Sequence, residues 1–239
     1  SRSHNGKGDT PLTWAARHGN TEATAWLIEK YSGGLALADE GWLDEHLPGA
    51  EGSGLEYTTR AGAGPLMIAC THGHVECTRL LLGAGAAVST ASNHGRTPLS
   101  AAIKHGHIEC ARLLVGAGAA VETGRTGGTS TPLDAAIKHD HMECARLLLE
   151  AGAIVDTAKA NGRTSLFTAV RWCYIDCVKL LSSYGACRLV QRGPSVNMTA
   201  EAVSRHFHGD TLTEWLVLSR HWLPLHHIEV LTLERARAL

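Results

Sequence analysis

The strongest constraint on the fold of this chain is a segment of about 33 residues that recurs along most of its length. AIKHGHIECARLL at 102–114 returns as AIKHDHMECARLL at 136–148, and an earlier version reads ACTHGHVECTRLL at 69–81. Each copy opens with a tripeptide of the Thr-Pro-Leu type, whose central residues are Pro11, Pro65, Pro98, Pro132 and Ser165. Their spacings are 54, 33, 34 and 33 residues, and a column of cysteines at 77, 110, 144 and 177 keeps the last three steps. Two independent landmarks in one register identify an internal repeat.

The residues within one repeat predict two short helices joined by turns. Pro98 suits the first turn of a helix, and the apolar residues that follow it form one side. Gly106 then suits the left-handed position that ends a helix. A second apolar pattern over 108–114 predicts another helix, which the glycine-rich stretch 116–121 ends. A single pair of this kind cannot bury its own apolar faces, so neighbouring repeats must stack.

The pattern of each repeat resembles the ankyrin repeat family. The family's G-x-T-P-L start reads here as Gly95–Leu99, and its central Gly-His pair reads as Gly106 and His107. The likeness covers residues 5–31 and 60–187 and implies an all-α ankyrin-repeat solenoid with β-hairpin or turn tips. The histidine that the family usually carries after the leucine is replaced here by Thr13, Met67, Ser100, Asp134 and Phe167.

The repeats predict a single ankyrin-repeat domain over residues 1–239. Clear repeats are expected at about 5–31, 60–91, 92–125, 126–158 and 159–190, a degenerate one at 194–217 and a partial one at 223–239. An acidic insertion at 32–59 separates the first two repeats. The last repeat stops inside its second helix, whereas a solenoid normally ends in a polar cap. We therefore expect that the native chain continues or that a partner covers this end.

Composition narrows the classes of function. The chain has 239 residues and a formal net charge of −1, which argues against a general nucleic-acid-binding protein. No apolar run approaches the ~20 residues that span a bilayer, so no membrane span is expected, and no signal peptide is visible. Seven cysteines, without the spacing of a small secreted scaffold, favour reduced thiols and an intracellular location, in the cytoplasm or an organelle.

The recurrent cysteines and histidines have a structural interpretation. The cysteine column falls at an inward helix position, where a free thiol behaves as a small hydrophobic group. Adjacent repeats stack roughly 10 Å apart, which is too far for one metal ion to join thiols of successive repeats. In the ankyrin family the histidine of the Gly-His pair packs and hydrogen-bonds at the turn; the equivalents here are His74, His107 and His141. We therefore expect no metal and no cofactor.

Cationic residues gather at the end of each predicted first helix. In ankyrin-like proteins such residues face a groove, so the resemblance implies partner contacts by Arg17, His18, His72, Lys104, His105, Lys138, His139, Arg171 and Trp172. Arg96 and Arg163, near the hairpin tips, extend this set. One interpretation is a solvated face whose cations are favoured near helix C-termini. The other is a groove for an acidic peptide or loop, sensitive to pH between roughly 5 and 8 through its histidines.

The insertion is acidic and admits three interpretations. Residues 32–60 contain six carboxylates against the single Arg60, and 38–47 could form a short helix that carries Trp42. Long insertions in compact arrays are usually mobile or functional. The segment is a solvated excursion, a docking finger for another protein with Trp42 as its anchor, or a strand of chain that folds back onto the basic groove.

The sequence carries little sign of catalysis. No phosphate-binding loop, nucleophile elbow or kinase motif is present, and the glycine-rich stretch 124–130 falls at a hairpin tip in the repeat register. The prediction is a non-catalytic interaction module or scaffold subunit that binds another protein, whose contacting segment is acidic and which could belong to a membrane-protein complex. The alternative is the recognition domain of a larger enzyme or signalling protein whose effector domain lies beyond Leu239. An enzyme with a cryptic site is the third class.

Overall fold

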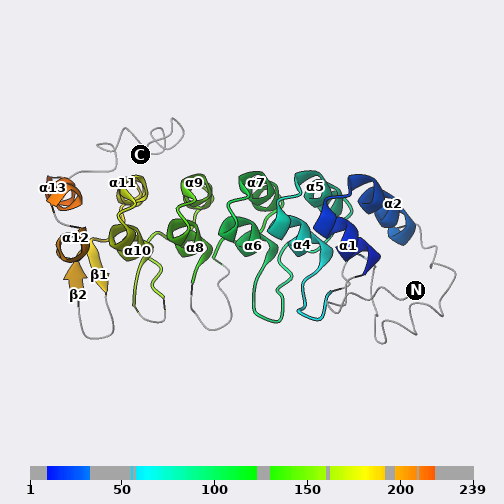
Figure 1. The fold of residues 1–239 in the computed structure, drawn as a ribbon, viewed down its shortest axis with the longest axis horizontal. Helices are drawn as coiled ribbons and strands as arrows, with labels where there is room; N and C mark the ends of the chain where they lie inside the picture. The colour runs from blue at the N-terminus through cyan, green and yellow to red at the C-terminus, as the bar shows by residue number, and fades with distance from the viewer. Residues whose placement is uncertain are drawn as a thin grey trace. The chain divides into compact units, whose positions relative to one another are not determined.

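The computed structural model describes residues 10–32, 55, 58–122, 130–159, 162–191, 197–208 and 210–218. The chain divides into two compact units, Ser1–Ala120 and Val121–Leu239, which we call the N-terminal and the C-terminal unit. Both are built from pairs of short helices, as Figure 1 shows. Trp42, nearly all of the predicted insertion and the predicted partial repeat at 223–239 lie outside the described residues.

The N-terminal unit stacks its helix pairs in two layers. Its pairs are α1 (Pro11–His18) with α2 (Thr21–Ser32), α4 (Pro65–His72) with α5 (Val75–Gly83), and α6 (Pro98–Lys104) with α7 (Ile108–Gly116). The first helices α1, α4 and α6 pack side by side, and the second helices α2, α5 and α7 form the other layer (Figure 1). This is the all-α stack of paired helices that the sequence predicts.

Each first helix of this unit begins at the predicted proline, and two of them are capped by a threonine. The Thr97 hydroxyl accepts a hydrogen bond from the Ser100 amide at 3.2 Å, while the Ser100 hydroxyl accepts one from the Thr97 amide at 2.9 Å. The Thr10 hydroxyl likewise accepts from the Thr13 amide at 3.2 Å. A cap of this kind contributes about 1 kcal/mol to stability. These caps fix where the helices start.

The turn between the two helices of a pair is locked by glycine and histidine. Gly19 and Gly73 have φ of 66° and 75°, the left-handed region that favours glycine. A Cβ atom at either residue would lie 2.5 Å from Nδ1 of a histidine in the next repeat. Those histidines donate from Nε2 to backbone carbonyls of the preceding repeat, His74 to Arg17 at 3.0 Å and His107 to Thr71 at 3.2 Å. The histidines pack and hydrogen-bond at the turn, as predicted, and the structure adds that these contacts join successive repeats.

Leucines, alanines and cysteines form the core of both units. The leucine that follows each helix start is almost fully buried; these residues are Leu12, Leu66, Leu99, Leu133 and Leu166. Burying such a side chain contributes about 2 kcal/mol. The cysteine column at 77, 110, 144 and 177 is also buried, and none of these four residues is in a disulfide. The Thr78 hydroxyl lies 3.7 Å from the sulfur of Cys70 and 3.6 Å from that of Cys110, so these thiols pack within the core.

The C-terminal unit also stacks helix pairs and adds a short hairpin. Its elements are α8 (Pro132–Lys138), α9 (Met142–Glu150), α10 (Ser165–Trp172), α11 (Ile175–Ser183), β1 (Leu189–Gln191), β2 (Asn197–Thr199), α12 (Ala200–His208) and α13 (Asp210–Leu218). The first helices α8, α10 and α12 pack in that order, and α13 packs on α12 (Figure 1). β1 and β2 pair antiparallel, with Val190 opposite Met198.

Two details of the C-terminal unit depart from the regular repeat. The turns after α8 and α10 place Asp140 and Cys173, in place of glycine, at φ of 56° and 58°. α12 begins two residues beyond Met198, the residue 33 positions after Ser165, because Thr199 caps it by accepting from the Ala202 amide at 3.2 Å. The helix pair α12 and α13 lies where the sequence predicts a degenerate repeat, and it buries Val203 and Leu216.

Candidate partner-binding face

Charges in the N-terminal unit are sorted between its two helix layers. Its described carboxylates all lie in second helices; they are Glu22 and Glu29 in α2, Glu76 in α5 and Glu109 in α7. Two of them pair within their own helices, Glu76 with Arg79 at 3.4 Å and Glu109 with Arg112 at 3.6 Å. The first helices and the loops before them contribute cations and imidazoles, and within the described residues they carry no carboxylate.

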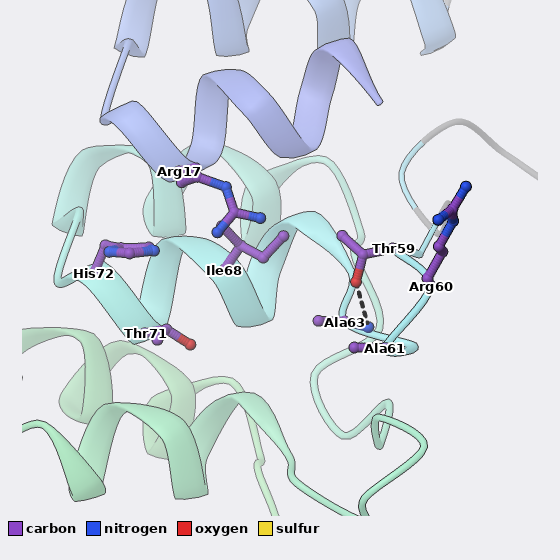
Figure 2. A pocket seen from close by; sticks show the side chains of 8 residues that line it. All are labelled: Arg17, Thr59, Arg60, Ala61, Ala63, Ile68, Thr71 and His72. Carbon is purple, nitrogen blue, oxygen red and sulfur yellow. Dashed lines mark hydrogen bonds between the residues drawn. The ribbon is translucent and has the colours of Figure 1, made fainter. Parts of the chain in front are cut away.

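One pocket opens where α1, α4 and the turn before α4 meet. This Arg17 pocket has a volume of about 320 Å³ and is lined by Arg17, Thr59, Arg60, Ile68, Thr71 and His72, with two alanines between them. Figure 2 shows the half-buried Arg17 side chain beside Ile68, with His72 toward one end and Thr59 and Arg60 toward the other. The pocket thus combines a guanidinium from one repeat with an imidazole from the next.

A second pocket continues from the first along the same layer. This Lys104 pocket has a volume of about 120 Å³, and its polar and charged lining includes Ser92, His94, Arg96, Lys104 and His105. Ala61, Ala63 and Thr71 line both pockets. Because these shared residues are small, the two pockets form one surface across neighbouring repeats. We call the two pockets together the basic face.

Contacts between two loops hold the basic face in place. The Asn93 amide donates to the Ala61 carbonyl at 3.1 Å, and the Asn93 side chain donates to the Arg60 carbonyl, also at 3.1 Å. Gly62, at φ of 72°, approaches so closely that a Cβ atom would lie 2.4 Å from the Asn93 side-chain oxygen. The loop that carries Arg60 is therefore fixed against the loop that carries His94 and Arg96.

The charged side chains that line the basic face are cations. The partial loss of solvent around the exposed His72 side chain, and then the positive charge of Arg17, lowers the pKa of His72 below its ordinary value. His74, His107 and His18 act in the same direction. No carboxylate of the described part of this unit opposes them from the first-helix layer. Within the described residues, an anion entering this face from the first-helix layer would meet cations and imidazoles.

The predicted contact residues of the N-terminal unit separate into two groups. Arg17 and His72 line the Arg17 pocket, and Arg96, Lys104 and His105 line the Lys104 pocket. His18 lies outside both lining sets, because its ring stacks on Trp14 with centroids 4.1 Å apart and donates from Nδ1 to the Trp14 carbonyl at 2.8 Å. Sequence reasoning missed Thr59, Arg60, Thr71 and His94. Arg60 lies 33 residues before Asn93, and this spacing was the available signal for a loop contact.

The predicted contact residues of the C-terminal unit lie at the ends of α8 and α10. Lys138 and His139 are exposed. Trp172 is 52% exposed, and the Arg171 guanidinium lies 5.7 Å from the centre of its ring. Arg163 lies 5.0 Å from the Phe167 ring, so this cation packs against the start of α10. This unit therefore presents the exposed ring of Trp172 beside Arg171, together with the exposed side chains of Lys138 and His139.

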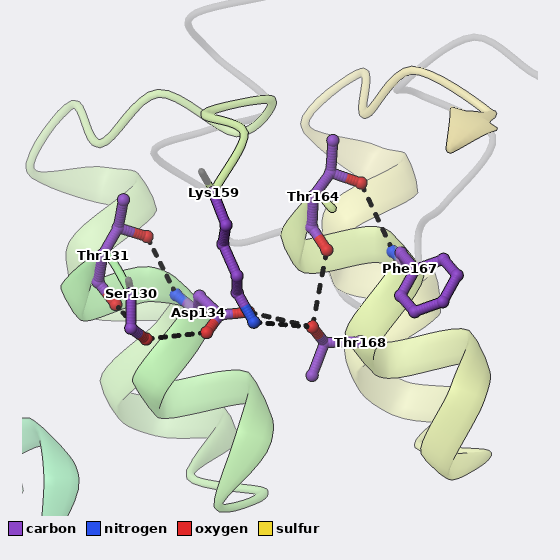
Figure 3. A network of polar contacts seen from close by, with 7 residues as sticks. All are labelled: Ser130, Thr131, Asp134, Lys159, Thr164, Phe167 and Thr168. Carbon is purple, nitrogen blue, oxygen red and sulfur yellow. Dashed lines mark hydrogen bonds and ion pairs between the residues drawn. The ribbon is translucent and has the colours of Figure 1, made fainter. Parts of the chain in front are cut away.

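The first-helix layer of the C-terminal unit also contains a buried carboxylate. Asp134 is 2% exposed, and its Oδ1 lies 2.6 Å from Nζ of Lys159. The Ser130 and Thr168 hydroxyls donate to the two carboxylate oxygens at 2.7 and 2.9 Å (Figure 3). Both oxygens of Asp134 are thus satisfied inside the protein. The sequence marked Asp134 only as a departure from the family pattern.

Within the described ranges, no group of three histidine, cysteine, aspartate or glutamate side chains is placed to hold a metal ion. Burial, reinforced by Asp140, raises the pKa of the Cys177 thiol to about 12, so this cysteine is not a nucleophile at neutral pH. No helix in the part of the chain that the structure describes has the length and apolar character needed to cross a bilayer.

Comparison with known proteins identifies the repeats. A family profile for ankyrin repeats (3 copies) matches residues 43–126 and 121–192, and a profile for the single ankyrin repeat matches residues 7–39. The crystal structure of the human ASB11 ankyrin repeat domain is similar, with a TM-score of 0.68 and 25% sequence identity. That match covers 89% of this chain and 84% of the human domain. The search of curated proteins finds no match.

Proposed function

Because this chain belongs to the ankyrin repeat family, whose domains typically bind proteins, we propose that it is a non-catalytic module that binds an acidic segment of a partner protein. The basic face of the N-terminal unit is the proposed contact surface. Its Arg17, Arg96 and Lys104 are joined there by Arg60 and by the imidazoles of His72, His94 and His105.

The sorting of charge between the two helix layers is the observation that supports this proposal. A solvated surface with no partner has no need to exclude one sign of charge, and mixed signs are the ordinary arrangement. In the N-terminal unit the described carboxylates are confined to second helices, and the pockets lie on the opposite layer. A face of one sign attracts an oppositely charged segment and raises its association rate.

The C-terminal unit supplies the remaining proposed contacts. Lys138 and Arg171 add positive charge, His139 adds an imidazole, and the exposed ring of Trp172 supplies the kind of aromatic anchor on which binding energy concentrates. Arg163 and Trp42 complete the proposed set, Arg163 from the segment before α10 and Trp42 from the acidic insertion. A stable interface needs roughly 800 Å² on each partner, which is more than the two small pockets offer alone.

The test reverses charges on one layer and compares the result with the other layer. The double variant Arg17→Glu, Lys104→Glu changes the basic face, and Arg79→Glu, Arg112→Glu makes the same change in charge on second helices. A labelled peptide of alternating Glu and Gly serves as the probe, and its Gln counterpart as the neutral control. We expect the first variant to lose about tenfold in affinity for the Glu peptide at low salt, and the second to lose far less.

The same variants decide whether the face acts on a natural partner. Proteins that co-purify with the wild-type chain should be lost with the Arg17→Glu, Lys104→Glu variant and retained with its second-helix control, as read by mass spectrometry. The thermal midpoint of both variants should stay near that of the wild type, because all four side chains lie outside the core. A collapse of the midpoint with unchanged binding would refute the assignment of the face.

The second proposal, a recognition domain within a larger enzyme or signalling protein, predicts the same dependence on this face.

A further inference from the structure

Two neighbouring imidazoles recur at both pockets of the basic face, as His72 with His74 and as His105 with His107. The Arg17 pocket differs in adding the guanidinium of Arg17 from the preceding repeat, where the Lys104 pocket has Thr71. The His72 ring packs alongside His74 with centroids 6.0 Å apart. His74 is tied in turn to the Arg17 carbonyl, the backbone of the residue that gives the pocket its guanidinium. The ring is exposed, so a ligand in the pocket can reach it. The contact between the His72 ring and His74 is made within the protein and does not require a ligand.

Within the described residues, the charged or titratable groups that face His72 are cations and imidazoles. Arg17 and His18 come from α1, His74 from the turn before α5, and His107 from the turn before α7. Lys104 and His105 end α6, the next first helix of the stack. A proton on His72 is therefore disfavoured while the pocket holds no anion, since each neighbour repels the added charge.

We propose that the Arg17 pocket receives one carboxylate side chain of the acidic partner segment, and that His72 takes up a proton as this carboxylate enters. This inference rests on the proposed function, to which it adds a specific subsite and a dependence on pH. The guanidinium of Arg17 and the protonated ring of His72 contact the carboxylate from two neighbouring repeats. Binding then fixes the segment at one point of the basic face and sets its register.

The sign of the pH dependence follows from the two states of the pocket. In the free protein the pKa of His72 lies below its ordinary value, so the ring is neutral at pH 7. A carboxylate beside the ring favours the charged form, so the complex holds one more proton than the free protein over part of the acid range. Binding therefore strengthens as pH falls toward 5.5 and weakens as pH rises. An exposed pair about 5 Å apart changes proton affinity roughly three- to tenfold, and the binding constant must change by the same factor.

The Glu-Gly peptide tests this coupling, because its carboxylates stay ionised above about pH 5. We expect wild-type protein to bind it about three- to tenfold more tightly at pH 5.5 than at pH 7.5. His72→Gln should lose most of that ratio. His206→Gln removes an exposed imidazole of α12 that lies outside the pocket, and it should keep the wild-type ratio. The substitution at His72 replaces an exposed side chain at the end of a helix, and a thermal melt checks the fold.

A second measurement needs no variant in the binding assay. The ring signal of His72, identified by its loss in the His72→Gln spectrum, should titrate at a higher pH with the Glu peptide than with the Gln peptide. An unchanged ratio in His72→Gln, or a titration that the Glu peptide does not move, overturns the inference and leaves the proposed function standing. If the Glu peptide binds no better than the Gln peptide at either pH, and Arg17→Glu has no effect, the proposed function itself fails.

Discussion

The first helices of the two units differ in whether they contain a carboxylate. In the N-terminal unit they carry none among the described residues, and the cations beside them line open pockets. In the C-terminal unit Asp134 sits inside α8 and holds Lys159, Ser130 and Thr168 in a buried network. The same architecture thus lines open pockets with cations in one unit and joins a carboxylate, an ammonium and two hydroxyls in a buried network in the other.

One repeat position accounts for much of this contrast. Ser100 and Asp134 both follow the leucine of the opening tripeptide and occupy the third position of their helices. Ser100 completes a helix cap with Thr97, whereas Asp134 reaches across to Lys159 and to Thr168 of the next repeat. The position tolerates either solution because a threonine caps the helix backbone in both cases. The side chain at this position therefore stabilises its own helix in the N-terminal unit, and it links two repeats in the C-terminal unit.

The largest expected effect comes from removing the buried carboxylate. Asp134→Ala leaves Lys159 without its ion-pair partner and two hydroxyls without their acceptor, and should cost about 3 kcal/mol of unfolding free energy. Ser100→Ala, its equivalent in the N-terminal unit, removes one cap hydrogen bond and should cost about 1 kcal/mol. Urea unfolding of both variants measures the difference. Equal costs would contradict the contrast between the units, and partial recovery in Asp134→Leu, Lys159→Met would support it.

Gly73→Ala should be the next most damaging change. Its φ of 75° disfavours any Cβ atom, and that atom would meet the His107 ring at 2.5 Å. The expected cost is about 2 kcal/mol, since the left-handed conformation alone accounts for about half of it. Gly85→Ala is the matched control, because Gly85 has φ of 85° and open space around its Cβ position. Amide hydrogen exchange in α4 and α5 reports the loss, and identical costs for the two variants would rule out the contact with His107.

Cys173→Gly makes the reverse change in the C-terminal unit. Cys173 holds a φ of 58° where the N-terminal unit uses glycine, so the substitution relieves strain. Glycine also loses more backbone entropy on folding, so the net gain should be only about 0.5 kcal/mol. A rise in the urea midpoint checks this expectation. A fall would mean that the cysteine side chain contributes packing that outweighs the strained backbone.

The smallest effect is expected at the exposed ion pairs of the second helices. Arg79→Ala breaks a pair in which both side chains are more than half exposed, and it should change stability by less than about 0.5 kcal/mol. Arg146 of the C-terminal unit makes the equivalent pair but is 18% exposed, so Arg146→Ala also removes packing of the side-chain stem. Its cost should be about 1 kcal/mol. If Arg79→Ala proved the more costly, burial would not be what separates the two arginines.

The sequence alone predicts the fold well, because its repeat has strong local signals. Pro98 and Gly106 mark the start and end of a helix through their backbone preferences, which depend little on the rest of the molecule. The burial of the cysteine column follows from the position of each cysteine on the apolar side of its second helix. The late start of α12 was not predictable from the spacing of prolines, since it depends on the Thr199 cap after a short hairpin.

The candidate site was predictable only in part. Arg17, His72 and Lys104 stand at equivalent ends of helices, so the repeat itself points to them. Thr59, Arg60 and His94 reach the pockets through the contact of two loops, which no local pattern encodes. The same reason hides the Asp134 network, because Lys159 lies 25 residues further along the chain.

The joints between repeats have a consequence for how such a surface can change over time. His74 and His107 donate to backbone carbonyls, so these hydrogen bonds do not depend on which side chain the accepting residue carries. The accepting carbonyl belongs to Arg17 in one case and to Thr71 in the other, and both hydrogen bonds form. Residues at these points can therefore be exchanged freely by mutation without loosening the stack. Affinity for a new target can be acquired at these sites while the scaffold is inherited intact.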